Sequence, residues 1–205
     1  MRYEKPAITY DQKIQRLIDR GLIIDDLNKV SHLLSRVSYY RFSGYFYPLL
    51  EDKENHIFKE GSTFQQAFNM YCFDRKLRAL VLSELEKIEV AVRTQIAYTF
   101  SHSDGPFWFE NGQLFWQEDK HSKLLKTYRE EFNRSEELFV KSFREKYSNE
   151  YPPCWILVEL LTFGTLSRTY SALKSTNSKT AIASYFGVTE KVFISWLHSL
   201  NHVRN

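Results

Sequence analysis

The fold class is decided by residues 63–100, which read TFQQAFNMYCFDRKLRALVLSELEKIEVAVRTQIAYTF. Thr63 and Gln66 form the capping-box pattern that marks the start of a helix. The apolar residues that follow recur at steps of three and four: Leu77, Val81, Leu85, Ile88, Val92 and Ile96. This spacing places them on one face of an α-helix. The segment therefore predicts a central helix that is the longest helical segment of the chain.

Shorter helices are predicted on both sides of this segment. Thr9 and Gln12 form another capping box, and Gly21 is a natural stop for the helix that they start. A second helix is predicted to begin at Asp25 or Asp26 and to run into the aromatic stretch 39–47. Residues 51–61 are polar and predict a loop with one short extended piece. Further helices are predicted at 119–133, at 135–147, after Pro152-Pro153 in several pieces, and from Thr189 to the last residues.

Composition supports an all-α fold in a single domain, residues 1–205. The chain of 205 residues is 43% hydrophobic and 16% aromatic, which is too apolar for a disordered chain. Only 7 Gly and 5 Pro are present, too few for the frequent turns of a β-sandwich or barrel. No internal repeat or linker between domains is evident.

Cysteine usage and apolar runs indicate the cellular setting. Cys72 and Cys154 are far apart and show no CxxC spacing, so they predict neither a disulfide framework nor a zinc cluster. No stretch has the length and apolar character of a signal peptide or a membrane span. We therefore expect a cytoplasmic protein with no membrane partner.

The net charge of +3 is carried by the end of the chain. Residues 151–205 hold five basic residues against two acidic ones, whereas the two signs balance in residues 1–150. This asymmetry points weakly to an anionic partner near the C-terminus. A solvated basic surface without a partner is the alternative.

The common catalytic motifs are missing from the sequence. It contains no glycine-rich phosphate loop, no GxSxG and no HExxH. His198 and His202 lie four residues apart on the last predicted helix, a spacing that can bind a metal, but no third ligand is identifiable. Histidines at such positions are more often ordinary polar residues of a helix. We therefore predict no metal and no cofactor.

Three charged residues are candidates for a functional site on the basis of their positions alone: Glu89, Arg93 and Arg41. Glu89 and Arg93 are four apart on the central helix, which predicts a structural salt bridge. The alternative makes Arg93 a phosphate contact, with Glu89 beside it, since a planar guanidinium suits that task. Arg41 lies within the aromatic stretch 39–47, whose rings predict a core and alternatively a platform for unpaired bases. A charge among so many rings must reach solvent, an acidic partner or a phosphate.

Five separated segments together resemble the Abi-like (abortive infection) proteins of bacteria. They occur in family order and cover almost the whole chain: SYYRFSGYFYPL (38–49), FDRKLRALVLSELEKIEVAVRTQIA (73–97), GPFWF (105–109), ELLTFGTLSRTY (159–170) and WLHSLNHVRN (196–205). The resemblance implies a helical bundle of the HEPN class with additional N-terminal and peripheral helices. It also implies a homodimer in which two copies of an Arg-x4-6-His motif form a metal-independent ribonuclease site.

In the Abi-like branch this motif looks like Arg-Asn-x-x-x-His, and here Arg204 and Asn205 match its first two positions. The resemblance makes them the candidate catalytic residues. None of the six histidines follows an arginine by five to seven residues, so no substitute motif exists in the sequence. RNA cleavage by the 2′-hydroxyl needs a group that transfers protons near neutral pH, which histidine usually supplies. We expect this chain to be nearly inactive as given and truncated within its active-site helix.

Three hypotheses for the function follow. The first is an RNA-cleaving toxin or phage-defence effector, with RNA as substrate and an antitoxin protein or small RNA as a possible partner. The second is a module that binds RNA or an antitoxin without cutting, through Arg204, Arg93 and Arg41. The third is a protein-interaction or dimerisation domain. The coding sequence beyond codon 205 discriminates between them, because three further residues followed by histidine would favour the enzyme.

Overall fold

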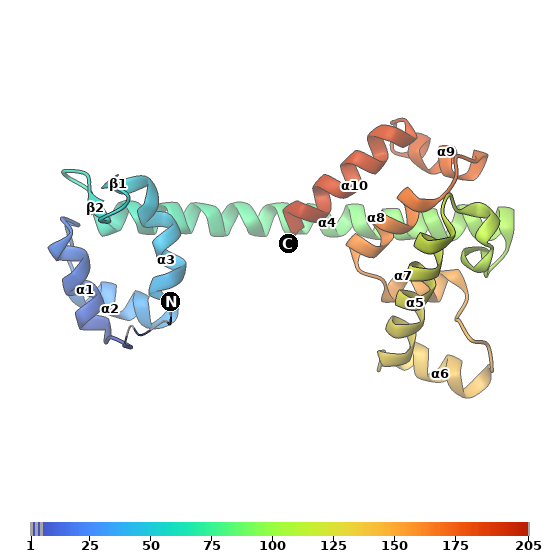
Figure 1. Cartoon of the computed structure of the whole chain (residues 1–205), viewed down its shortest axis with the longest axis horizontal. Coiled ribbons are helices and arrows are strands. Elements are labelled where there is room, and N and C mark those ends of the chain that lie inside the picture. Colours follow the sequence, from blue (N-terminus) through green and yellow to red (C-terminus); the bar gives the residue numbers. More distant parts are fainter. Residues whose placement is uncertain (1, 3, 5, 205) are drawn as a thin grey trace. The chain divides into compact units, whose positions relative to one another are not determined.

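The computed structural model describes residues 2, 4 and 6–204 and divides the chain into two compact units, Met1–Val81 and Leu82–Asn205 (Figure 1). In the described part, ten α-helices accompany one short two-stranded hairpin. The prediction of an all-α fold is therefore confirmed. The HEPN-like arrangement and the single domain stay predictions.

Helix α4 (Phe64–Asp104) is the predicted central helix and, at 41 residues, the longest element. Its capping box is formed as expected: the Thr63 amide donates to Gln66 Oε1 at 2.9 Å, and the Gln66 amide donates to Thr63 Oγ1 at 3.2 Å. The helix runs four residues past the predicted end and stops at Gly105, which has a φ of +88° that favours glycine. Among the residues described, no helix has the combined length and apolar character needed to cross a bilayer.

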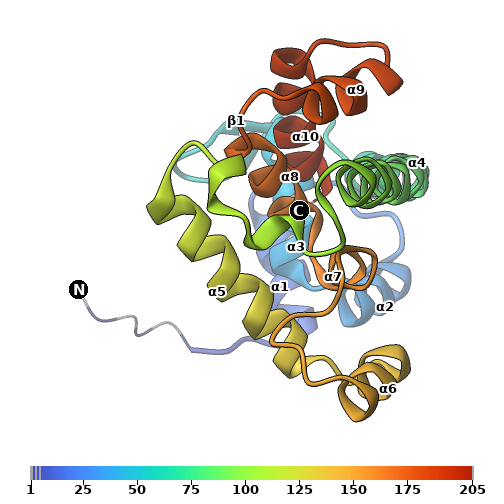
Figure 2. The same ribbon diagram turned by 90° about the vertical axis from the view of Figure 1, so that its right-hand side faces the viewer.

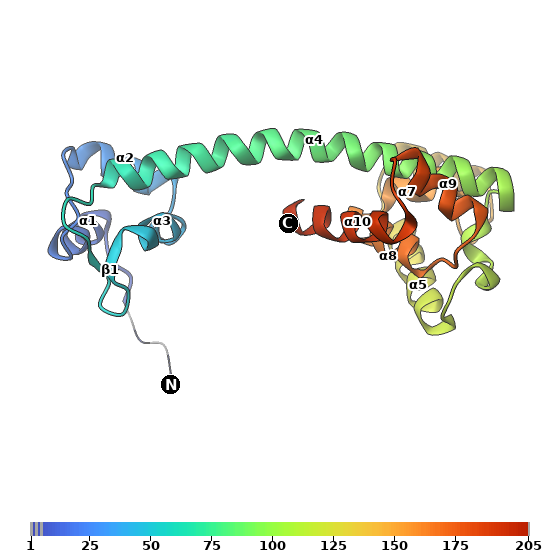
Figure 3. The ribbon, with the colours of Figure 1, turned by 90° about the horizontal axis from the view of Figure 1, so that it is seen from above.

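The first unit consists of three short helices, a hairpin and the start of α4 (Figure 3). The elements are α1 (Tyr10–Asp19), α2 (Leu27–Arg36), α3 (Tyr39–Phe46), a 3₁₀ turn η1 (Tyr47–Leu49), β1 (Leu50–Asp52) and β2 (Ile57–Phe58). The strands are antiparallel, with Leu50 opposite Phe58, and both side chains are buried in the core of this unit. Burial of these two residues explains why a polar loop sequence holds a hairpin.

The helix starts predicted in this unit are confirmed, and one continuation is corrected. Thr9 caps α1 with the predicted capping box, and the Asp26 side chain caps α2. The second helix does not run into the aromatic stretch. It ends at Arg36, and α3 begins separately because the Ser38 hydroxyl accepts the amide of Arg41 at 3.3 Å.

The aromatic stretch divides between the core and the surface. Phe42 and Phe46 are buried in the core of the first unit, as the core interpretation predicts. Tyr40 lies on the opposite side of the helix and is 88% exposed. Arg41 is also exposed, so its charge reaches solvent. Base stacking by the exposed ring stays a prediction.

The second unit contains the rest of α4 and six further helices (Figure 2). They are α5 (Glu118–Arg134), α6 (Leu138–Lys146), α7 (Cys154–Leu160), α8 (Phe163–Ala172), α9 (Asn177–Tyr185) and α10 (Glu190–Arg204), with 3₁₀ turns η2 (Trp108–Glu110) and η3 (Gly112–Leu114) after α4. Helix α6 starts three residues later than predicted, because the Ser135 hydroxyl accepts the Glu137 amide in a turn before the helix. Helix α10 packs on α8 and α9.

The core of this second unit forms along one face of α4. Val92 and Ile96 of the predicted apolar face are buried, as is Phe100 one turn further along the helix. The Phe109 ring meets the rings of Tyr128 and Tyr151 edge to face, at centroid distances of 5.8 Å in both cases. This core fixes α7, α8 and α10 beside the second half of α4, where the candidate site lies.

Candidate functional site

A pocket of about 680 Å³ lies in the second unit, where α4, α8 and α10 meet. Helix α4 contributes Glu89 and Arg93, and the segment between α7 and α8 contributes Leu161 and Thr162. The remaining polar lining comes from α8 and α10: Ser167, Arg168, His198, Asn201, His202 and Arg204. Three arginines and one glutamate therefore line the pocket, so its charge is positive even with neutral histidines.

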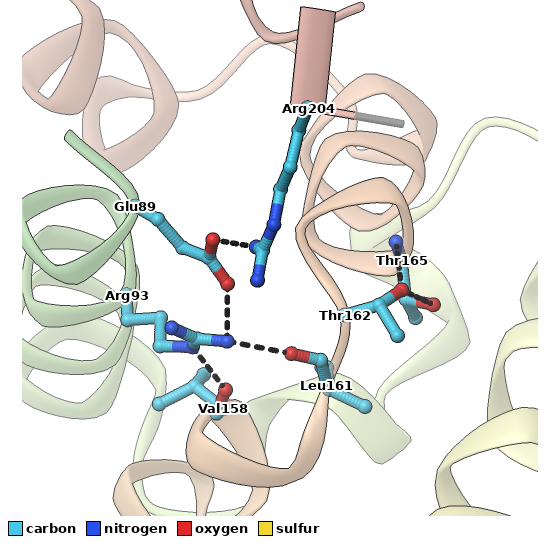
Figure 4. Close-up of polar contacts among 7 residues, drawn as sticks. All are labelled: Glu89, Arg93, Val158, Leu161, Thr162, Thr165 and Arg204. Atoms are coloured by element: carbon cyan, nitrogen blue, oxygen red, sulfur yellow. Dashed lines mark hydrogen bonds and ion pairs between the residues drawn. The ribbon is translucent and has the colours of Figure 1, made fainter. Parts of the chain in front are cut away.

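Glu89 holds two of the three arginines of the pocket together (Figure 4). Its side chain is only 5% exposed, and it forms ion pairs with both Arg93 and Arg204. The Oε1 atom lies 2.5 Å from Arg93 Nη2, and the Oε2 atom contacts Arg204 Nη1. The predicted Glu89–Arg93 salt bridge is thus present, and it is one arm of a three-residue cluster centred on the buried Glu89 carboxylate.

Arg93 is anchored by the backbone as well as by the carboxylate. Its Nε donates to the carbonyl of Val158 and its Nη2 to the carbonyl of Leu161, both at 2.9 Å. The side chain is 16% exposed. Burial lowers the pKa of the Arg93 guanidinium, while the charge of Glu159 acts in the opposite direction. These contacts favour a structural role, in which Arg93 ties the end of α7 to α4. Its phosphate contact stays a prediction.

Arg204 reaches the pocket from the last turn of α10 and is 43% exposed, so it contacts both Glu89 and solvent. Its position depends on the close packing of α10 against α8. A Cβ atom at Gly164 would lie 3.0 Å from Oδ1 of Asn201, so the missing side chain lets Asn201 of α10 pack closely against α8. Arg204 is therefore the arginine of the cluster that a ligand can reach most directly.

The start of α8 adds further groups that favour an anion. The Thr162 hydroxyl caps the helix by accepting the Thr165 amide at 3.2 Å. Arg168, one turn along, is exposed and donates to the Thr165 hydroxyl at 3.0 Å. The partial positive charge of a helix N-terminus attracts negative groups. Together with Arg204, these features make the pocket suited to a phosphate.

His198 and His202 both line this pocket, with their Nε2 atoms 3.2 Å apart. Among the described residues, no group of three or more His, Cys, Asp or Glu side chains is arranged to hold a metal ion. The two imidazoles are instead polar groups beside Arg204 and Arg168.

The residues expected at the site fall into three groups. Glu89, Arg93 and Arg204 come together in one cluster, although 115 residues separate the first from the last. Arg41 belongs to the first unit. Asn205 lies outside the described residues. The catalytic and RNA-binding roles of all five stay predictions.

Sequence reasoning overlooked two groups of the pocket, Arg168 and Asn201. Both lie inside stretches that carry the family resemblance, ELLTFGTLSRTY and WLHSLNHVRN. The signal was therefore present, but nothing in the spacing alone shows that these two stretches meet.

A comparison with known families identifies the family of the chain. The family model described as Abi-like protein matches residues 32–205. The chain belongs to this family, and its membership points to abortive infection, a form of phage defence. No curated protein and no solved structure matched the chain.

Proposed function

We propose that this Abi-like chain is a toxin-type defence protein whose pocket binds a phosphate of RNA, and that this site cleaves RNA without a metal when the histidine of the motif is present. The observation that carries the proposal is the position of Arg204. It lies in a positively charged pocket, contacts Glu89, and still exposes 43% of its side chain. Arg204 is also the first residue of the Arg-Asn pair that resembles the HEPN motif.

The chemistry assigns a separate task to each group. The ribose 2′-hydroxyl attacks the adjacent phosphorus, and the bond to the 5′-oxygen of the next nucleotide breaks. A base accepts the proton of the 2′-hydroxyl, and an acid returns a proton to the leaving oxygen. Arg204 stabilises the negative charge that builds up on the phosphorane, and Glu89 orients its guanidinium. In a chain that continues through the family's motif, the histidine that follows Asn205 after three further residues would supply a proton transfer.

Cleavage of a labelled single-stranded RNA in EDTA tests this assignment. Three proteins are compared: the 205-residue chain, the chain extended by three residues and a histidine, and the extended chain with Arg204→Ala. We expect the extended chain to cut, and the 205-residue chain to be slower by about 10²- to 10⁴-fold, the usual contribution of proton transfer. Arg204→Ala should lower the rate of the extended chain by about 10²- to 10³-fold, because a charge-stabilising donor is lost.

Arg134→Ala is the matched control, since Arg134 is an exposed arginine of the same unit outside this pocket. It should leave the rate unchanged. Thermal unfolding checks that Arg204→Ala remains folded, as expected for a side chain whose loss leaves Glu89 paired with Arg93. Strong cutting by the 205-residue chain, or activity that survives Arg204→Ala, would show that the catalytic site is elsewhere.

The same proposal includes a homodimer that brings two C-terminal helices together. Three large apolar residues of α10 are exposed: Val192, Trp196 and Val203. Their spacing of four and seven residues places them in one stripe along the helix. An exposed apolar stripe of this kind supports the proposal, because another protein that covers it would remove apolar surface from water. A second copy of the chain, related by a two-fold axis, would match stripe with stripe.

Replacing Trp196 with glutamate should shift the protein from dimer to monomer, because it places a charge in the middle of this stripe. Light scattering over a range of concentrations measures the change. Tyr185→Glu is a suitable control, since Tyr185 is an exposed aromatic residue on α9. A wild-type chain that stays monomeric at high concentration would contradict the dimer, as would a Trp196→Glu variant that stays dimeric.

A module that binds RNA or an antitoxin without cutting is the second candidate function. The observation in its favour is the Glu89 carboxylate, which already compensates part of the arginine charge in the pocket. An extended chain that binds RNA through Arg204 but does not cleave it would support this alternative.

A further inference from the structure

A second basic pocket adjoins the candidate site. We call it the α5 groove; it has a volume of about 440 Å³. It is lined by Lys120, Lys123, Leu124 and Thr127 of α5, by Ser167, Arg168, Ser171 and Ala172 of α8, and by His198 of α10. Ser167, Arg168 and His198 also line the pocket of Arg204. The two pockets therefore share one wall, and Arg168 belongs to both.

The α5 groove has a one-sided charge. Lys120, Lys123 and Arg168 are exposed, and none of the described residues that line the groove is acidic. Lys123 forms an ion pair with Asp119, whose Oδ2 atom lies 3.7 Å from the ammonium group. Both members of that pair are strongly exposed, so water screens it and the lysine stays available to another anion. The groove is thus a cationic extension of the candidate site.

The remaining lining indicates how a ligand would be held. Lys120, Lys123 and Thr127 are three and four residues apart, so they form one face of α5. Leu124 and Ala172 are the apolar members of the lining. Among the described lining residues there is no Phe, Tyr or Trp on which a base could stack. Positive groups without a stacking platform suit a phosphate backbone and would bind with little base preference.

We propose that the α5 groove is the path of a single-stranded RNA as it leaves the candidate site, with backbone phosphates contacting Arg168 first and then Lys120 and Lys123. The inference rests on the proposed function and extends it, because it assigns RNA contacts to residues outside the Arg204 cluster. A single strand fits this assignment, since its backbone can follow a groove that turns from α10 across α8 to α5. Duplex RNA presents a stiff backbone and is recognised across its wide minor groove.

Fluorescence anisotropy with a labelled single-stranded RNA oligonucleotide tests the path in the full chain. The double variant Lys120→Gln/Lys123→Gln should weaken binding roughly tenfold at moderate salt, because two phosphate contacts are lost. Its slope of log affinity against log salt should become shallower by about 1.4, since each contact to a single strand contributes about 0.7. Lys126→Gln/Lys146→Gln is the matched control, because it removes the same charge from the same unit at positions that line neither pocket. It should leave the slope unchanged.

Arg204→Ala in the same assay separates this inference from the proposed function. If Arg204→Ala weakens binding while Lys120→Gln/Lys123→Gln behaves like its control, the path across α5 is wrong and the candidate site stands. If Lys120→Gln/Lys123→Gln binds RNA more weakly and with a shallower salt dependence while Arg204→Ala binds normally, the groove binds RNA and the proposed site is wrong. Equal losses of RNA affinity in the two lysine double variants would mean that only the net charge of the protein matters. That result would overturn the proposed path. Duplex RNA that binds as tightly as the single strand would overturn the assignment to a single strand.

Discussion

Replacing Glu89 with glutamine should destabilise the protein by about 3 kcal/mol. Removing one partner of a buried ion pair leaves the other charge without compensation, which costs about 3–5 kcal/mol. The lower end of this range applies here because Arg93 keeps its two carbonyl acceptors, those of Val158 and Leu161. Urea unfolding followed by circular dichroism measures the change.

The same helix provides a matched control. Glu84 pairs with Lys87 at 2.7 Å, but both side chains are more than half exposed. Glu84→Gln removes the same charge from the same helix and should change stability by less than about 1 kcal/mol. Equal losses of stability from the two substitutions would contradict the claim that the buried Glu89 carboxylate is needed to compensate the arginine charge.

A double-mutant cycle tests the physical reason for the loss. Arg93→Met removes the partner charge, which is largely buried, and like Glu89→Gln it should be destabilising by itself. The double variant should lose less than the sum of the two, because it leaves no uncompensated charge between α4 and α7. Additive losses would mean that the ion pair contributes nothing and that Arg93 acts through its carbonyl contacts alone.

Local sequence signals predict the helices of this protein well. Thr9, Asp26 and Thr63 each cap the helix that their pattern indicates, because a cap needs contacts only within one turn. The break between α2 and α3 was missed, since helical spacing continues through Ser38 although its hydroxyl starts a new helix. Periodicity alone does not reveal such a break.

The candidate site can be predicted only in part from the sequence, because local patterns do not show tertiary contacts. The Glu89–Arg93 pair follows from its spacing of four residues on one helix. The contact of Glu89 with Arg204 depends on how α8 and α10 pack, with Asn201 close against Gly164. Arg168 enters the pocket through the same tertiary arrangement. Contacts of this kind have no local signal, so only the folded chain brings them together.

Phe42→Ala should destabilise the protein strongly and Tyr40→Ala hardly at all, although the two residues are only two positions apart in the aromatic stretch. Phe42 is fully buried and contacts three other rings, with centroid distances of 5.9 Å to Phe46, 5.2 Å to Phe64 and 5.4 Å to Tyr71. Its removal leaves a cavity in the core of the first unit and should cost about 3–5 kcal/mol. Tyr40 is 88% exposed, so its removal should change stability by less than about 0.5 kcal/mol.

Hydrogen exchange measured by mass spectrometry locates the effect in the chain. Phe42→Ala should raise exchange in α1 to α3 and at the start of α4, because these elements share the core that loses the ring.

The affinity of Tyr40→Ala for single-stranded RNA tests the alternative role of the aromatic stretch, in which an exposed ring stacks a base. An exposed ring that stacks a base contributes about 1–3 kcal/mol, so its loss would weaken binding at least several-fold. We expect unchanged affinity, because the stretch serves the core through its buried rings. Weaker RNA binding by Tyr40→Ala would mean that the first unit also contacts RNA. A Phe42→Ala variant as stable as Tyr40→Ala would contradict the assignment of Phe42 to the core.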